Sequence, residues 1–67
     1  MYKNLRIEML KKEMTMADLS AKTGIKYQTL SVKMRGESQF TLQEAISIKK
    51  ALESELPIEI LFAVQVE

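Results

Sequence analysis

The chain has 67 residues, 46% of them hydrophobic and 28% charged, which predicts one small folded domain and excludes a disordered chain. It contains neither cysteine nor histidine, so disulfides, thiolate metal sites and the usual general base near neutral pH are excluded, and we expect no metal, no cofactor and no enzymatic activity. The net charge of +1 points to no partner by itself, and without a long apolar run or a signal peptide the sequence predicts a cytoplasmic protein that does not bind a membrane.

The first predicted helix covers residues 2–13. This segment has no glycine or proline and is rich in residues that favour helices. Leu5 and Met9 are four residues apart and therefore share one face of the helix. Glu8 and Lys12 have the same spacing, which predicts an ion pair along the helix surface.

A second and a third helix are predicted on either side of a glycine. Thr15 and Asp18 have the spacing of a capping box, in which a hydroxyl and a carboxylate cap the first turn, and this helix is expected to continue to residue 22. Gly24 tolerates a positive φ, so the chain can turn sharply there. The third helix is predicted over 26–35 and ends at the next glycine.

The fourth predicted helix covers residues 41–52. It begins with a second capping box, formed by Thr41 and Glu44. Its apolar residues are spaced to form one stripe that faces the core: Leu42, Ala45, Ile48 and Leu52. The segment before it, over 37–40, is predicted to be a loop.

The last residues predict a brief fifth helix and a tail. The helix covers residues 57–62, and either Ser54 caps it or Pro57 occupies its first helical position. Apolar residues then alternate with others in the period of a strand: Phe62, Val64 and Val66. The tail over 63–67 is therefore either a short β-strand that pairs with a second copy of the chain, or a frayed or helical end.

The segment over 15–36 has the pattern of a helix-turn-helix motif, in which two short helices are joined by a tight glycine turn. Ser20 is placed where the two helices approach most closely and where only a small side chain fits. Leu19, Ile25 and Leu30 are the apolar residues expected to hold the two helices together. The order of cap, small residue, glycine and apolar positions makes the pattern more specific than a glycine between two helices.

The third helix is predicted to bury one side and expose the other. At about 100° per residue, Leu30 and Met34 point inward, and four residues gather on the opposite side: Gln28, Ser31, Val32 and Arg35. These side chains suit the major groove of DNA, where Gln bonds adenine, Arg bonds guanine or a phosphate, and Val contacts a thymine methyl. Lys26 and Tyr27 stand at the start of the helix, where phosphates or bases would approach. The alternative interpretation is an ordinary solvated polar face.

Charge is divided unequally between the two halves of the chain. Residues 1–36 carry eight basic and three acidic side chains, a net +5, whereas residues 37–67 carry two basic and six acidic ones, a net −4. A basic surface attracts polyanions, because neutralising phosphates releases their counterions. The asymmetry predicts a basic working face, although a chance distribution in a small domain gives the same pattern.

A family resemblance is carried by two stretches, MADLSAKTGIKYQTLSVKMRG and FTLQEAISIKKAL. They resemble the Cro/CI-type (XRE family) helix-turn-helix domains of phage and bacterial regulators, and the resemblance extends over residues 5–62. It implies an all-α, compact five-helix bundle of the lambda-repressor-like kind, with the third helix in the major groove of double-stranded DNA. It places base contacts on residues around the third helix: Lys26, Tyr27, Gln28, Ser31, Val32 and Arg35. It places backbone contacts at the start of the second helix and on Ser38 and Gln39.

Four positions depart from the family pattern. Met16 stands where the family usually has a glutamine that contacts a phosphate, so that contact is open for this chain. Ser20 replaces the usual alanine and adds a hydroxyl that needs a partner. Lys26 replaces the usual capping serine, and a cation there costs roughly 0.3–1 kcal/mol unless it faces a phosphate. Lys33 falls at an often apolar position, where its stem is expected to cover the core while its ammonium reaches water or DNA.

The resemblance and the third-helix face together predict a sequence-specific DNA-binding regulator. Its simplest form is a Cro-like repressor that acts as a homodimer on a pseudo-palindromic operator and needs no small-molecule ligand. Residues 1–62 would be the DNA-binding domain, and 63–67 the tail. The alternative is a protein-interaction module on the same scaffold, such as an antirepressor or an antitoxin partner. That module would depend instead on exposed apolar residues: Ile46, Val64 and Val66.

Overall fold

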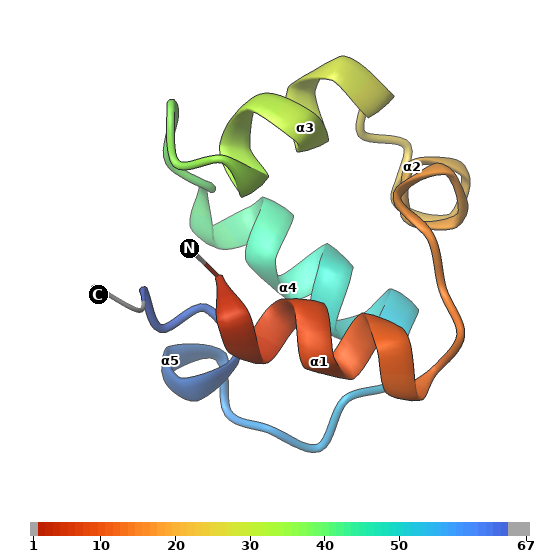
Figure 1. Cartoon of the computed structure of the whole chain (residues 1–67), viewed down its shortest axis with the longest axis vertical. Coiled ribbons are helices and arrows are strands. Elements are labelled where there is room, and N and C mark those ends of the chain that lie inside the picture. The colour runs from red at the N-terminus through yellow and green to blue at the C-terminus, as the bar shows by residue number, and fades with distance from the viewer. Residues whose placement is uncertain (1, 65–67) are drawn as a thin grey trace.

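Five helices follow one another along residues 2–64, the part of the chain that the computed structural model describes (Figure 1). They are α1 (Lys3–Lys11), α2 (Met16–Thr23), α3 (Tyr27–Met34), α4 (Leu42–Leu52) and α5 (Ile58–Leu61). Every predicted helix is present, so the all-helical prediction is confirmed. No strand occurs in these residues, and the rest of the predicted strand, over 65–67, lies outside them. None of these five helices is both long and apolar enough to cross a membrane.

The starts of α2 and α4 are fixed by the two predicted capping boxes. The Thr15 hydroxyl accepts a hydrogen bond from the Asp18 amide at 3.2 Å, and the Thr15 amide donates to the Asp18 carboxylate at 2.9 Å. Thr41 and Glu44 make the same two bonds at 3.1 Å and 2.9 Å. Each box satisfies amides that the first turn of a helix leaves without partners, and losing such a cap typically costs about 1 kcal/mol. Both predictions are confirmed.

Four helix ends use the left-handed backbone region, and the residues there are Glu13, Gly24, Gly36 and Glu53. Gly24 ends α2 with a φ of 78°, as predicted, and its amide donates to the Ser20 carbonyl. Glu13 and Glu53 follow α1 and α4 with φ values of 54° and 51°, although neither is a glycine. A side chain in this region costs energy, because its Cβ crowds the following carbonyl oxygen. These two ends therefore carry backbone strain that surrounding contacts must offset.

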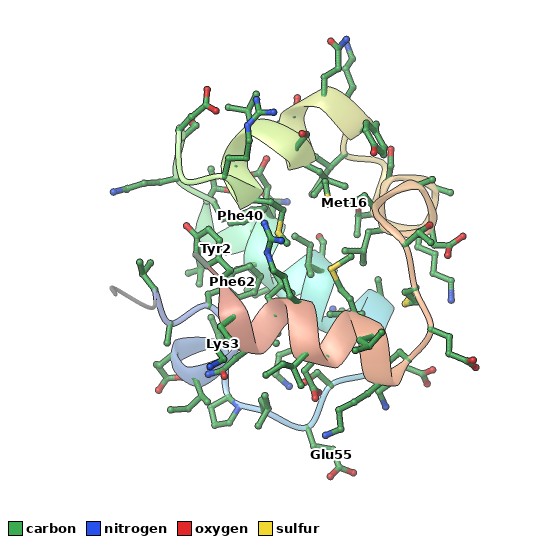
Figure 2. The ribbon with its side chains drawn as sticks, in the orientation of Figure 1. Tyr2, Lys3, Met16, Phe40, Glu55 and Phe62 are labelled. Carbon is green, nitrogen blue, oxygen red and sulfur yellow. The ribbon has the colours of Figure 1, made fainter. Side chains whose placement is uncertain are left out.

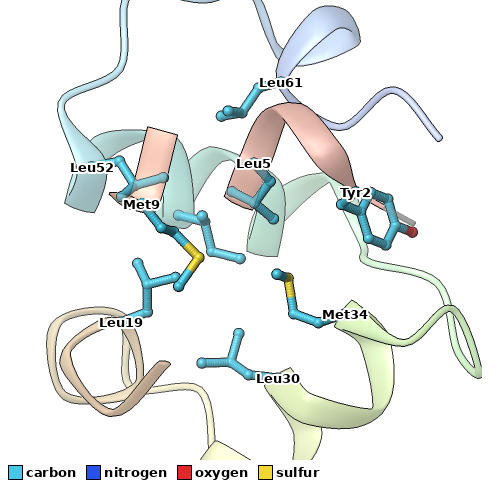
Figure 3. Packing of buried hydrophobic residues seen from close by; sticks show 9 residues of the cluster. Tyr2, Leu5, Met9, Leu19, Leu30, Met34, Leu52 and Leu61 are labelled. Carbon is cyan, nitrogen blue, oxygen red and sulfur yellow. The ribbon is translucent and has the colours of Figure 1, made fainter. Parts of the chain in front are cut away.

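The core lies where all five helices meet, and Figure 3 shows its side chains pointing toward a common centre. Each helix contributes at least one fully buried side chain: Leu5, Leu19, Leu30, Ile48, Leu52 and Leu61. The predicted stripe on α4 is correct for its last three residues and wrong for Leu42, which is 69% exposed. At 100° per residue, Leu42 lies about 120° around the helix from Ile48, so it falls at the edge of the apolar face.

Three aromatic rings tie the two ends of the described chain to the loop before α4. Tyr2, Phe40 and Phe62 pack edge to face, with ring centroids 5.2–6.1 Å apart. Figure 2 shows the three side chains gathered beside the start of α1. Aromatic pairs in this geometry contribute about 0.5–1.5 kcal/mol beyond the area they bury. The cluster therefore holds the segment between α3 and α4 against the body of the molecule.

Glu8 is buried and does not make the predicted ion pair with Lys12. One carboxylate oxygen accepts a hydrogen bond from the Ser54 hydroxyl at 2.7 Å, and the other pairs with Lys11 at 3.3 Å. The Ser54 hydroxyl also accepts from the Leu56 amide. The hydrogen bond from Ser54 and the Lys11 ammonium lower the pKa of Glu8 below its usual value, against the opposing effect of burial. The contact therefore links α1 to the segment before α5.

The start of α5 differs from both predicted alternatives. Ser54 uses its hydroxyl to bond Glu8 and does not cap the helix. Pro57 lies one position earlier than predicted, because it flanks α5 and the first helical residue is Ile58. Its carbonyl nevertheless accepts the amides of Ile60 and Leu61, so the proline still begins the hydrogen-bond pattern of this short helix.

Candidate nucleic-acid interface

The turn between α2 and α3 is fixed by hydrogen bonds from small hydroxyl side chains. Ser20 donates to the Ile25 carbonyl at 2.6 Å, which supplies the partner that its hydroxyl needs. Thr23 donates to the Leu19 carbonyl at 2.7 Å and accepts from the Ile25 amide at 3.2 Å. Leu19 and Leu30 are fully buried, and Ile25 packs against the same core. The predicted helix-turn-helix is confirmed, and these bonds fix how α3 is held relative to α2.

The two sides of α3 are as different as the sequence predicts. Leu30 and Met34 are buried in the core, whereas Gln28 and Arg35 are exposed. Ser31 is half-buried between these sides. Figure 1 places α3 at the end of the molecule opposite α5, so its outer side faces away from the bundle. This side carries an exposed amide and an exposed guanidinium, from Gln28 and Arg35.

One predicted member of the outer side differs from expectation. Val32 is half-buried and not fully exposed. Its backbone carbonyl accepts a hydrogen bond from the Glu37 amide, where the chain turns back after α3. Its side chain still retains part of its surface for an apolar contact such as a thymine methyl. Val32 therefore belongs to the edge of the outer side.

The start of α3 has no side-chain cap. Lys26 flanks the helix in an extended backbone conformation and makes no capping hydrogen bond, and the first turn contains no acidic residue. The loss of the cap was predicted, and it leaves first-turn amides without a side-chain partner. Lys26 and Tyr27 are both exposed, with 53% of Tyr27 accessible. A cation and an aromatic ring thus flank this end of α3.

The other end of α3 closes in a Schellman motif. Gly36 has a φ of 82°, its amide donates to the Lys33 carbonyl at 3.0 Å, and the Glu37 amide donates to the Val32 carbonyl at 3.1 Å. This turn brings the Glu37 carboxylate back to Arg35, whose Nε donates to it at 2.7 Å. Sequence reasoning did not identify Glu37, although a carboxylate two residues after an arginine and one after a turn glycine was a visible signal.

Lys33 does not behave as expected. Its side chain is largely buried, and its ammonium pairs with the Glu44 carboxylate and does not extend freely into water. The same carboxylate closes the capping box of α4 with Thr41. The Lys33 ammonium and then the Thr41 amide lower the pKa of Glu44 below its usual value. Lys33 therefore connects α3 to α4 on the side of α3 that faces the bundle.

The two predicted loop residues lie at the far end of α3 from its start. Ser38 and Gln39 are exposed in the segment between α3 and α4. A helix of eight residues is about 12 Å long, so the residues at the two ends of α3 are separated by roughly that distance. The exposed residues Lys26 and Gln39 thus lie at opposite ends of α3.

A hollow of about 430 Å³ opens between α1 and the helix-turn-helix. Met16 lines it together with Tyr27 and Ser31 from α3, and Arg6 stands on the α1 side. Figure 2 shows Met16 directed from α2 toward this space. A thioether has no hydrogen to donate, so the Met16 side chain cannot donate a hydrogen bond to a phosphate as the amide of a glutamine can.

The comparisons with known proteins agree with this geometry. Residues 4–61 match the family model described as the Cro/C1-type HTH DNA-binding domain. The match spans well over half of the chain and includes the whole of α2, α3, α4 and α5. No curated protein and no solved structure matches the chain significantly.

Proposed function

The chain belongs to the Cro/C1-type helix-turn-helix DNA-binding domain family, and we propose that it is a Cro-like repressor that binds double-stranded DNA with α3 in the major groove. The observation that carries this proposal is the contrast between the two sides of α3: Gln28 and Arg35 on the outer side are exposed, whereas the inner side is buried in the core. A major groove about 12 Å wide admits one α-helix with its side chains. An exposed helix at one end of a small bundle meets that requirement.

The residues proposed to contact bases are those on the outer side and at the start of α3. Gln28 suits adenine, Arg35 suits guanine, and Val32 suits a thymine methyl. Ser31 supplies a hydroxyl to either kind of base pair. The remaining proposed base contacts come from the exposed start of the helix: Lys26 and Tyr27.

The proposed backbone contacts lie after α3. Ser38 and Gln39 are exposed and polar, and such side chains bond phosphate oxygens without selecting a sequence. Lys33 is also a proposed DNA contact, although its ammonium pairs with Glu44 and would have to exchange that partner for a phosphate. It supports the interface by holding α3 on α4.

We propose further that the protein acts as a homodimer on a pseudo-palindromic operator. Residues 1–62 form the proposed DNA-binding domain, and 63–67 the proposed dimerisation tail. An apolar hollow of about 310 Å³ supports this, because Leu42 and Val64 line it and are 69% and 50% exposed. A second copy related by two-fold symmetry would cover the same surface on both chains. Two copies of α3 would then lie about 34 Å apart on one face of DNA.

The second candidate function is a protein-interaction module, such as an antirepressor or an antitoxin partner, on the same scaffold. It is favoured by the same apolar surface and by Ile46, which is exposed one turn after Leu42 on α4. Under this alternative, substitutions at Ile46 or Val64 abolish function. Substitutions on the outer side of α3 leave function intact.

The test is selection of bound sequences from random duplexes. We expect an inverted repeat to be enriched, which supports DNA binding and two-fold symmetry together. The double variant Gln28→Ala/Arg35→Ala is expected to lose most of its affinity for the selected duplex while its thermal midpoint stays close to that of the parent. Gln43→Ala/Lys50→Ala is the matched control, because it removes one amide and one cation from exposed positions on α4. Parental binding by the first double variant would refute the proposed interface.

A further inference from the structure

The Arg35 guanidinium donates a hydrogen bond to the Glu37 carboxylate, which lies just after the backbone turn that ends α3. Glu37 follows Gly36, and the two Schellman hydrogen bonds at the end of α3 fix where the chain turns. The Glu37 oxygen accepts from Arg35 Nε at 2.7 Å, and Arg35 Nη1 lies 3.5 Å from the Ser31 hydroxyl. The contact therefore follows from the shape of the helix end.

We propose that Glu37 is a specificity-determining residue that restricts Arg35 to base contacts. This inference rests on the proposed function, and it concerns how one interface residue is oriented. With Nε bonded to Glu37 and one Nη1 hydrogen directed to the Ser31 hydroxyl, the second Nη1 hydrogen and the two Nη2 hydrogens remain as donors at the end of the guanidinium. A pair of donors of this kind matches the O6 and N7 acceptors of guanine. Glu37 thus presents Arg35 in the orientation that a bidentate guanine contact requires.

The charge of Glu37 adds a second effect. An arginine at the edge of a groove can bond a phosphate as readily as a guanine, and a phosphate contact carries no sequence information. The Glu37 carboxylate repels a phosphate that approaches Arg35, whereas guanine is neutral and is not repelled. Glu37 therefore weakens non-specific binding more than it weakens binding to the correct sequence.

The Arg35–Glu37 pair contributes little to stability. Both side chains are more than half exposed, and exposed ion pairs of this kind contribute little to folding. Removing Glu37 is expected to leave the thermal midpoint unchanged. A change in base preference without a change in stability is the effect that a purely structural role would not produce.

The test compares Glu37→Gln and Glu37→Ala with the parent and with Arg35→Ala. Dissociation constants are measured on the selected duplex, on the same duplex with guanine replaced by adenine at the position that depends on Arg35, and on an unrelated duplex. Glu55→Gln is the matched control, because Glu55 is exposed and lies at the end of the molecule opposite α3 (Figure 2). It removes the same charge from a site remote from the interface.

We expect Glu37→Ala to reduce the preference for guanine about twofold to fivefold and to tighten binding to the unrelated duplex by a similar factor, the size expected for one exposed charge pair. The preference of Glu37→Gln for guanine is expected to lie between those of the parent and Glu37→Ala. Glu55→Gln is expected to keep the parental preference. An unchanged preference in Glu37→Ala, or a preference that does not depend on Arg35 at all, overturns the inference while DNA binding stands. If the parent binds none of the duplexes, the proposed function fails as well.

Discussion

Two ion pairs lie on opposite sides of α3 and differ in burial and reach. Lys33 and Glu44 are 11 residues apart, join α3 to α4, and have side chains that are 14% and 21% exposed. Arg35 and Glu37 are two residues apart, and their side chains are 55% and 59% exposed. An exposed pair contributes about 0–1 kcal/mol to stability, whereas breaking a buried pair leaves a poorly solvated charge without a partner. The comparison teaches that charge on the inner side of α3 positions the helix, while charge on its outer side remains available for binding.

The largest loss of stability is expected from a substitution on the inner side of α3, where Leu30 is fully buried. Leu30→Ala is expected to lower the free energy of unfolding by about 2–5 kcal/mol, because it removes apolar contacts and leaves a cavity. Gln28→Ala on the outer side is the matched control and should change this free energy by less than about 0.5 kcal/mol. Urea unfolding measures both. Similar losses in the two variants would contradict the division of α3 into a packed and an available side.

The next effect compares the two ion pairs directly. Lys33→Met keeps the apolar stem and removes the ammonium, and it should lower the free energy of unfolding by about 1–2 kcal/mol, less than the 3–5 kcal/mol of a fully buried pair. Arg35→Met should lower it by less than about 0.5 kcal/mol. The double variant Lys33→Met/Glu44→Gln should recover part of the loss, because it also removes the charge left behind. Equal losses of unfolding free energy in the two single variants would contradict the proposed difference between the two ion pairs.

A smaller gain in the free energy of unfolding is expected at the end of α4, away from both ion pairs. Glu53 ends α4 with a φ of 51°, a conformation that glycine adopts without Cβ strain. Glu53→Gly should therefore raise the free energy of unfolding by about 1 kcal/mol. Thermal unfolding and duplex binding are measured together, and the account predicts higher stability with unchanged affinity. A change in affinity would show that stability and binding are not separable in this domain.

Acid should weaken the inner pair and the Glu8 contact together. The pKa values of Glu44 and Glu8 are lowered from the ordinary value of 4.5, so the unfolded chain takes up protons first as the pH falls. The stability they contribute is fully present above pH 4.5 and is lost as the pH drops through the lowered values. Thermal midpoints measured from neutral to acidic pH should fall below this point, and Glu44→Gln should flatten the decline. A parental midpoint that does not move with pH would contradict the role of both carboxylates.

Features set by neighbouring residues could be predicted from the sequence. The two capping boxes need only a hydroxyl and a carboxylate three residues apart, and the turn at Gly24 needs only a residue that tolerates positive φ. The inner and outer sides of α3 follow from a period of 3.6 residues. The helix positions and the two sides of α3 therefore followed from local patterns, whereas the five-helix bundle was implied by the family resemblance.

Features set by distant partners could not be predicted in this way. Glu8 accepts a hydrogen bond from Ser54, which is 46 residues away in the sequence, and does not pair with the nearby Lys12. Lys33 pairs with Glu44 on another helix, so its ammonium links α3 to α4. A local pattern gives the side on which a residue lies, but it does not identify which charge from another element reaches it.

The central claim is that the outer side of α3 selects a DNA sequence, and one titration tests it most directly. The selected duplex and a scrambled duplex of the same length and composition are each titrated with the parent protein at physiological salt. The account predicts that the selected duplex binds at least about 10³-fold more tightly, the lower end of the range for specific DNA-binding proteins. Equal affinity for the two duplexes, or binding to neither, would contradict it.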